Sequence, residues 1–151
     1  MSVLVDINIL IRTIPSQHSP NKLAVEALTV LGHQSETLCV TPQNLYELWS
    51  VSTRPVSQNG LGLTVADTKA EIIRIKGLFQ LLDETSAILP EWEKLVEKYQ
   101  VSGKNSHDTH LVAAMVVHGV PRILSFNKTD FQRFSEIIVI SPEEVVQGKT
   151  S

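Results

Sequence analysis

The chain has 151 residues, of which 42% are hydrophobic and 19% charged, and its formal net charge is −3. This length and composition are typical of one globular domain with a single core, and the charge excludes a protein that binds nucleic acid through an overall basic surface. The single cysteine, Cys39, excludes an intramolecular disulfide framework, and its apolar surroundings predict a buried thiol. Since no apolar run approaches transmembrane length and no signal-peptide pattern is present, we expect a cytoplasmic protein without a membrane partner.

Short apolar runs alternate with amphipathic segments in the first third of the chain. Proline, glycine and capping residues separate them. The pattern predicts a strand at Val3–Val5, a helix at Ile7–Ile14, a turn at Ser16–Pro20, a helix at Asn21–Leu31 that Gly32 ends, a strand at Thr37–Val40, and a helix at Pro42–Thr53 with Thr41 as its N-cap.

The same alternation continues to the carboxyl end. It predicts a Pro- and Gly-rich loop at 54–63, a long helix that Thr64 caps, a short strand at Leu81–Thr85, helices at Pro90–Tyr99 and His107–His118, strands at Arg122–Phe126 and Ile137–Ile140, and a last turn at Ser141–Glu144. Helices that alternate with buried strands indicate an α/β fold, a three-layer sandwich with a central, mostly parallel, five-stranded sheet. We expect one domain over residues 1–147 and a frayed tail over residues 148–151.

Asp6 stands where the first predicted strand ends. Ligands of open α/β sheets bind outside the carboxyl ends of the strands, so Asp6 is a candidate site residue. Aspartate is also a preferred helix N-cap, and Asp6 has the alternative role of accepting a hydrogen bond from the amide of Asn8 or Ile9. Other carboxylates at the same edge would favour the functional interpretation.

Further polar residues follow later strands or begin adjacent helices. Glu47 lies in the helix after the second strand, Asp108 in the first turn of its helix, and Asn127 and Asp130 after the fourth strand. Each has an ordinary alternative: a solvated helix face for Glu47, the helix dipole for Asp108, a turn residue for Asn127 and a cap of the turn Phe131–Phe134 for Asp130.

Carboxylates that converge on one cleft raise one another's pKa unless cations lie between them. Mg²⁺ or Mn²⁺ is the natural partner of such hard oxygen ligands, and either ion can activate water and orient an attack on phosphate. His107 and His110 lie three apart on one helix near this cleft. Because carboxylate sites rarely recruit histidine, we interpret both as ordinary helix-start residues.

Four segments resemble, in order, the motifs of PIN-domain ribonucleases. Asp6-Ile7-Asn8 after an apolar strand is similar to the first motif, and Thr41–Leu48 (TPQNLYEL), which ends beside a helical Glu, is similar to the second. His107–Ala114 (HDTHLVAA) resembles the third, and Ile123–Phe131 (ILSFNKTDF) resembles the fourth. The four motifs together extend from Val3 to Phe131, and their order is more specific than any one of them.

Within this family, the length and the lack of an extra domain resemble VapC-type toxins of toxin–antitoxin pairs. The resemblance implies a five-stranded parallel sheet, a Mg²⁺- or Mn²⁺-dependent endoribonuclease, a homodimer and inhibition by a small cognate antitoxin. It assigns catalysis and metal binding to Asp6, Glu47, Asp108 and Asp130, and the orientation of ligands or water to Asn8 and Asn127.

Two features depart from the family pattern. Ser125 stands two residues before Asn127, where another polar residue is common, and it can still form a hydrogen bond. His107 and His110 flank Asp108 where smaller residues are common, and they can alter the approach of substrate. Four cations near the predicted rim are candidates for RNA phosphate contacts, with ordinary surface charge as the alternative: Arg12, Arg54, Lys104 and Lys128.

The expected reaction is hydrolysis of a phosphodiester bond in single-stranded or looped RNA. Water attacks phosphorus, no covalent protein intermediate forms, and the products carry a 5′-phosphate and a 3′-hydroxyl. Two alternatives remain: a non-catalytic PIN-like module that binds RNA or protein, and a phosphohydrolase that uses Asp6 as its nucleophile.

Overall fold

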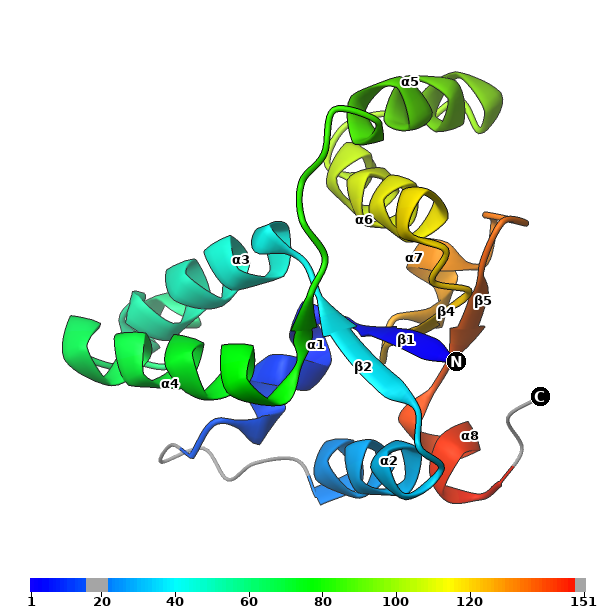
Figure 1. The fold of residues 1–151 in the computed structure, drawn as a ribbon. Helices are drawn as coiled ribbons and strands as arrows, with labels where there is room; N and C mark the ends of the chain where they lie inside the picture. Colours follow the sequence, from blue (N-terminus) through cyan, green and yellow to red (C-terminus); the bar gives the residue numbers. More distant parts are fainter. Residues whose placement is uncertain (16–21, 149–151) are drawn as a thin grey trace.

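A five-stranded parallel sheet forms the centre of the computed structural model, which describes residues 1–15 and 22–148 (Figure 1). Its strands are β1 (Ser2–Val5), β2 (Thr37–Val40), β3 (Gln80–Leu81), β4 (Arg122–Leu124) and β5 (Ile138–Ile140). They lie in the order β3-β2-β1-β4-β5, and every adjacent pair is parallel. The predicted α/β class is therefore confirmed.

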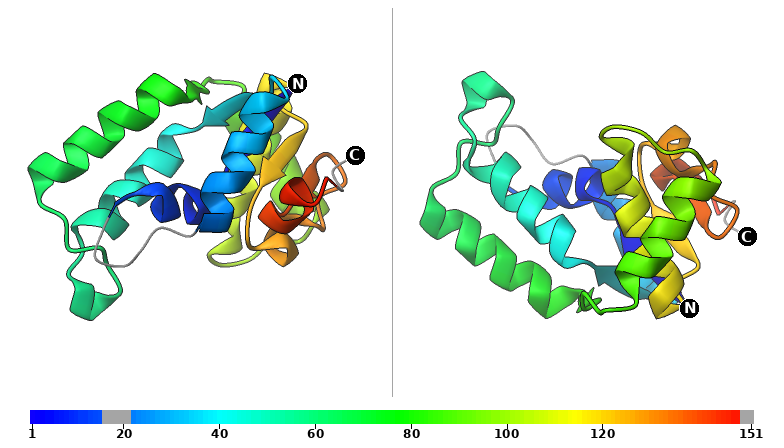
Figure 2. Two further views of the ribbon diagram at one scale, coloured as in Figure 1. Left: turned by 90° about the horizontal axis from the view of Figure 1, so that it is seen from below. Right: turned by 90° about the horizontal axis from the view of Figure 1, so that it is seen from above.

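Helices cover both faces of the sheet. They are α1 (Ile7–Leu10), α2 (Lys22–His33), α3 (Pro42–Thr53), α4 (Val65–Leu78), α5 (Ile88–Lys98), α6 (Asn105–His118), α7 (Lys128–Phe131) and α8 (Pro142–Val146), with 3₁₀ turns η1 (Ile11–Thr13) and η2 (Val56–Gln58). The view from below in Figure 2 has α2 and α8 in front of the sheet, whereas the view from above has α5 and α6 in front. None of the described helices is long and apolar enough to cross a membrane.

Alternation along the strands divides the core between the two faces. Val3 and Val5 of β1 pack with α1, α2, α3, α4 and α8, whereas Leu4 packs with α5, α6 and α7. The same alternation separates Ile123 from Leu124 on β4. A strand that is apolar at every position is therefore buried on both sides, as the continuous apolar runs predicted.

Several predicted boundaries differ from the structure. The segment predicted as one helix at Ile7–Ile14 is split into α1 and η1, and α2 continues through Gly32 to His33. In place of the strand predicted at Leu81–Thr85, the structure has the two-residue strand β3, which begins one residue earlier. β3 is an edge strand and pairs with β2 alone. β2 and α3 have their predicted ends, and the ends predicted for the other strands and helices differ from the structure by no more than two residues. The predicted turn at Ser16–Pro20, residue 21 and residues 149–151 lie outside the described residues.

Polar residues follow the strands at the carboxyl edge of the sheet. Asp6 follows β1, Thr41 follows β2, Ser125 follows β4 and Ser141 follows β5. Thr41 forms a capping box with Asn44, in which the Thr41 hydroxyl accepts from the Asn44 amide and Asn44 Oδ1 accepts from the Thr41 amide. This edge is where a parallel sheet presents ligand-binding groups.

Candidate active site

Asp6 is almost fully buried at the end of β1, with 4% of its surface exposed. It is the N-cap of α1, and its Oδ1 accepts a hydrogen bond from the amide of Ile7 at 2.8 Å. The predicted capping bond from the backbone amide of Asn8 or Ile9 is wrong in its donor, because Oδ1 accepts from the amide of Ile7, the first residue of α1. Oδ2 remains free for other partners, so capping and a role in a site are compatible.

Asn8 and Ser125 hold the second oxygen of Asp6. Oδ2 accepts from the Ser125 hydroxyl at 2.7 Å and from Asn8 Nδ2 at 3.2 Å. Asn8 also donates to Ser125 Oγ at 3.1 Å, and its Oδ1 accepts from the Phe126 amide at 3.2 Å. The hydrogen bond expected of Ser125 is therefore present. These contacts fix the Asp6 carboxylate in one orientation.

Asn127 and Asp130 lie beyond this network, at the start of α7. Both side chains are exposed. The Asn127 amide donates to Ser125 Oγ at 3.0 Å, whereas its side chain makes no capping hydrogen bond to α7. Asp130 lies inside α7, so the alternative that it caps a turn at Phe131–Phe134 is wrong.

Glu47 projects from α3 and is held by a glutamine that sequence reasoning missed. Gln43 Nε2 donates to Glu47 Oε1 at 2.8 Å and to the His107 carbonyl at 3.0 Å. Gln43 Oε1 contacts Nδ1 of His110, and Nε2 of His110 pairs with Glu84 at 2.5 Å. Gln43 and Glu47 lie four residues apart on a helix, so the sequence could have indicated their contact. The contacts of Gln43 with α6 could be recognised only in the folded structure.

The four acids interact electrostatically at one edge of the sheet. Burial raises the pKa of Asp6 to about 6, and the charges of Glu47 and Asp130 add to this effect, although the hydrogen bonds from Ser125 and Ile7 oppose it. Burial likewise raises the pKa of Asp108 to about 6, and the charges of Asp130, Asp6 and Glu47 raise it further, while His107 opposes them. The structure therefore brings together the acids that the motifs pointed to, and their negative charges repel one another.

Within residues 1–15 and 22–148, no group of three or more His, Cys, Asp or Glu side chains is arranged to hold a metal ion on its own. The donor set nevertheless suits Mg²⁺ or Mn²⁺. It consists of carboxylate oxygens, and two of the carboxyls have pKa values raised to about 6 by burial and like charge. Mg²⁺ usually keeps several waters and binds one or two carboxylates, so a loose set of acids is the kind of protein site that it uses.

A family model for the PIN domain matches residues 3–137, a range that begins before Asp6 and ends after Asp130. The chain belongs to the PIN domain family. A search of the curated proteins finds no match.

Solved structures from toxin–antitoxin complexes have the same fold as this PIN domain. VapBC2 from Rickettsia felis, bound to a DNA fragment from its promoter, aligns with a TM-score of 0.69 and 15% identity over 93% of this chain and 98% of that chain. A toxin–antitoxin complex from Klebsiella pneumoniae aligns with a TM-score of 0.65 and 16% identity over 93% of this chain and 97% of that chain. VapBC-1 from nontypeable Haemophilus influenzae aligns with a TM-score of 0.63 and 14% identity over 95% of this chain and 99% of that chain.

The four predicted RNA-contacting cations of this PIN domain lie in different settings. Arg12 donates to the Asn8 carbonyl at 2.5 Å and lies 4.7 Å from the centre of the Phe126 ring, beside the Asp6 network. Lys128 is paired with Glu144 on α8 at 2.7 Å. Arg54 follows the end of α3, which runs away from the sheet (Figure 1). Lys104 is exposed just before α6. Arg12 is thus the cation most directly joined to the site.

Proposed function

We propose that this PIN domain is a Mg²⁺- or Mn²⁺-dependent endoribonuclease and the toxin of a toxin–antitoxin pair. The observation that carries the proposal is the mutual electrostatic effect of Asp6, Glu47, Asp108 and Asp130 at the carboxyl edge of the sheet. Acids arranged in this way favour a divalent cation over an empty cleft. Membership of the PIN family and the likeness to toxin–antitoxin complexes support the same function.

The residues of this chain divide the work in the proposed reaction. Asp6 and Asp108 would hold the cation, with Glu47 and Asp130 completing the acidic surface. When bound, the cation would stabilise the charge that develops on the phosphate and lower the pKa of water. Ser125 and the Ile7 amide hold Asp6 in place, and Gln43 holds Glu47, so these carboxylates need little reorganisation when substrate binds.

The proposed substrate is single-stranded or looped RNA, cut by water to leave a 5′-phosphate and a 3′-hydroxyl. An open edge with exposed Asn127 and Asp130 can receive a strand whose backbone and bases are accessible. We further propose a small antitoxin as a partner, because the solved structures with this fold are described as toxin–antitoxin complexes. The resemblance to VapC-type toxins is the basis on which we also propose a homodimer.

The geometry favours this function over an Asp nucleophile. Both oxygens of Asp6 accept hydrogen bonds, from Ile7 on one side and from Ser125 and Asn8 on the other. A phosphohydrolase with an Asp nucleophile needs a second acid beside the first and a lysine after a later strand, and Asn8 and Ser125-Phe126-Asn127 fit that pattern poorly. A carboxylate held on both sides is instead suited to a fixed role as a ligand.

The decisive experiment compares two variants that make the same chemical change. Protein purified free of any antitoxin is incubated with RNA and Mn²⁺ or with EDTA. We expect cleavage with Mn²⁺ only, at least a 100-fold loss for Asp108→Asn, and little change for Asp67→Asn, which alters an exposed acid of α4. Induction of the wild type should arrest growth, and Asp108→Asn should not.

Three outcomes would contradict the proposal. Equal cleavage by wild type and Asp108→Asn would exclude the acidic site as its source. RNA binding without cleavage in Mn²⁺ would indicate the non-catalytic module. A phosphoryl group found on Asp6 by mass spectrometry would indicate the phosphohydrolase. Relief of growth arrest by the product of a neighbouring short reading frame would identify the antitoxin.

A further inference from the structure

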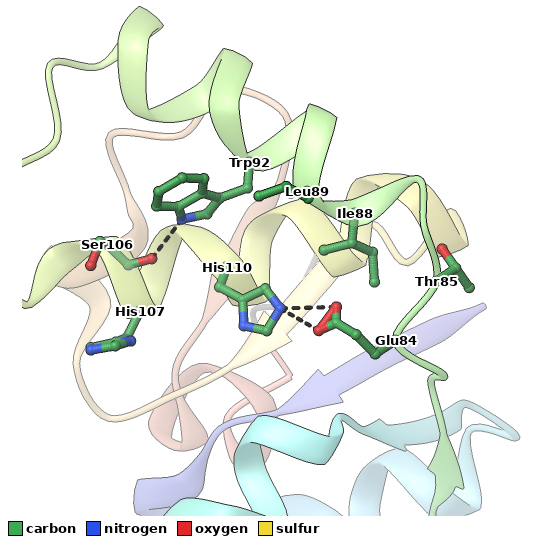
Figure 3. A pocket seen from close by; sticks show the side chains of 8 residues that line it. All are labelled: Glu84, Thr85, Ile88, Leu89, Trp92, Ser106, His107 and His110. Atoms are coloured by element: carbon green, nitrogen blue, oxygen red, sulfur yellow. Dashed lines mark hydrogen bonds and ion pairs between the residues drawn. The ribbon is translucent and has the colours of Figure 1, made fainter.

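A cavity of about 410 Å³ lies between α5 and α6 (Figure 3). Ile88, Leu89 and Trp92 line it from α5, and His107 and His110 line it from α6. Its volume lies within the range of about 300–1,000 Å³ that is typical of small-molecule sites. The PIN motifs account for the acids, and of the residues that line this cavity they include only His107 and His110.

The wall formed by α5 is apolar and is held against α6. Trp92 Nε1 donates to the Ser106 carbonyl at 2.9 Å, and this bond anchors the indole of α5 to α6 (Figure 3). Leu89 is 62% exposed, so the wall contributes apolar surface that no part of the described chain covers fully. A fixed indole with an accessible apolar surface is the kind of platform on which nucleobases stack.

The polar groups of the cavity favour a neutral ligand over an anion. No lysine or arginine is among the described residues that line it, so a phosphate or carboxylate would find no full positive partner. His110 already pairs with Glu84. The hydroxyls of Thr85 and Ser106 and the ring of His107 remain as hydrogen-bonding groups at the edge of the cavity.

The cavity adjoins the proposed metal-binding acids through two residues. His107, in its wall, directly precedes Asp108, and the two side chains interact electrostatically. The carbonyl of His107 also accepts from Gln43, which holds Glu47. A ligand in the cavity therefore contacts the residue next to Asp108, one of the acids that would hold the cation for the cut phosphate.

We propose that this cavity binds a nucleobase of the RNA strand next to the cut phosphate, with Trp92 as the stacking surface. The inference rests on the proposed nuclease function and extends it, because it gives the enzyme a preference for one base beside the cleavage site. Trp92 and Leu89 would form the apolar surface, and Ser106 and His107, which lie at the same end of the cavity as Trp92 (Figure 3), would contact the edge of the base.

Base binding is measured without metal and without cleavage. The chain has two tryptophans, so in ¹⁵N-labelled Trp49→Phe protein the remaining indole resonance is that of Trp92. We expect ribonucleosides, titrated in EDTA, to shift this resonance in a saturable way, and ribose to leave it unchanged. Leu89→Glu should weaken this binding at least 5-fold. Ile73→Glu should not, although it adds the same charge at a position that is also 62% exposed.

Cleavage of short RNAs that differ only beside the cut phosphate gives the second measurement. We expect the ratio of rates between the best and worst base to fall at least 5-fold in Trp92→Leu. Trp92→Phe should retain most of that ratio, because it keeps an aromatic ring and loses only the bond to Ser106. Equal losses in both variants would indicate that Trp92 is structural and would overturn the inference.

Failure of the inference and failure of the nuclease function give different results. No saturable shift with any nucleoside, together with RNA cleavage whose preference is unchanged in Trp92→Leu, would overturn the base site and leave the nuclease in place. Such a result would also follow if the cavity received a side chain of a protein partner instead. Saturable nucleoside binding without RNA cleavage would support the base site and overturn the nuclease.

Discussion

Ser125 donates its hydroxyl to Asp6 Oδ2 at 2.7 Å, although the two residues are 119 positions apart in the sequence. The parallel pairing of β1 with β4 causes this contact, because Val5 is in register with Leu124 and the next residue of each strand reaches the same edge. Ser125 Oγ also accepts from Asn8 Nδ2 and from the Asn127 amide. The donor and both acceptor positions of the hydroxyl are thus used, and Ser125 joins two motifs of the site.

Ser125→Ala should damage both the site and the fold. The Asn127 amide would lose its partner in a region where Ser125 is fully buried, so we expect a loss of about 1–3 kcal/mol in the free energy of unfolding. The pKa of Asp6 would rise further, because the Ser125 hydrogen bond lowers it. We expect RNA cleavage to need about 10–100-fold more Mg²⁺.

Urea denaturation measures the effect of Ser125→Ala on stability, and cleavage rates against Mg²⁺ concentration measure its effect on the site. Ser125→Thr, which keeps the hydroxyl, should behave closer to the wild type. If Ser125→Ala needed no more Mg²⁺ than the wild type, the role of Ser125 in positioning Asp6 would be contradicted.

Asp108→Asn should stabilise the metal-free protein at neutral pH. A carboxyl whose pKa is raised to about 6 binds its proton more tightly in the folded chain, so its contribution to stability falls as the pH rises from about 4 to about 6. Removing the charge should therefore raise the free energy of unfolding by about 1–3 kcal/mol at pH 7.5 and change it little at pH 4. Glu36, Glu136 and Glu144, whose pKa values are lowered, act in the opposite direction in both proteins and cancel in the difference, which reports Asp108 together with its repulsion by Asp130, Asp6 and Glu47.

Thermal denaturation with and without Mg²⁺ tests the same carboxyl. Mg²⁺ should raise the melting temperature of the wild type at pH 7.5 more than at pH 5, because it binds the ionised carboxyls of the folded state. Asp108→Asn should respond less, and Asp67→Asn should respond like the wild type. An equal response of all three proteins would place the binding of Mg²⁺ elsewhere.

The sequence predicted the parts of this site that follow directly from strand ends. Asp6 follows a buried apolar run that is recognisable without a structure. Ser125 was predicted inside the strand Arg122–Phe126, and its contact with Asp6 became visible only with the pairing of β1 and β4. Gln43 was missed, because its partners on α6 are 64 and 67 residues away and a lone glutamine on a helix resembles any surface residue. The two-residue β3 was placed about one residue late and predicted too long, since an edge strand with one neighbour needs no long apolar run.

Gln43→Leu should weaken catalysis by releasing Glu47. The amide of Gln43 joins Glu47 to the His107 carbonyl and to His110, so its loss frees the carboxylate and separates α3 from α6. We expect about a 10-fold fall in kcat, with a smaller change in KM, because the glutamine orients a charge and does not contact substrate. Gln147→Leu, an exposed glutamine after α8, is the matched control. A fall confined to KM would contradict this role.

Arg12 should contribute to RNA binding more than Lys128. Lys128 is already paired with Glu144 at 2.7 Å, and a phosphate would have to displace that carboxylate. Arg12 is exposed and uses its guanidinium to contact the Asn8 carbonyl and the Phe126 ring, which places beside Asp6 a positive charge that pairs with no acid of the described residues. In EDTA, Arg12→Ala should weaken binding of a labelled single-stranded RNA about 3–10-fold and reduce the dependence of log K on log salt by about 0.7, as expected for one lost phosphate contact.

The salt dependence separates a phosphate contact from a packing effect. Arg12→Lys keeps the charge but loses the planar contact with Phe126, so it should retain most of the salt dependence while losing part of the affinity. Lys128→Ala should change binding less than 2-fold, because its charge is neutralised by Glu144 in the free protein. If Lys128→Ala instead reduced the salt dependence as much as Arg12→Ala, the Glu144 pair would have to open when RNA binds, and the path of the strand would extend over α7 toward α8.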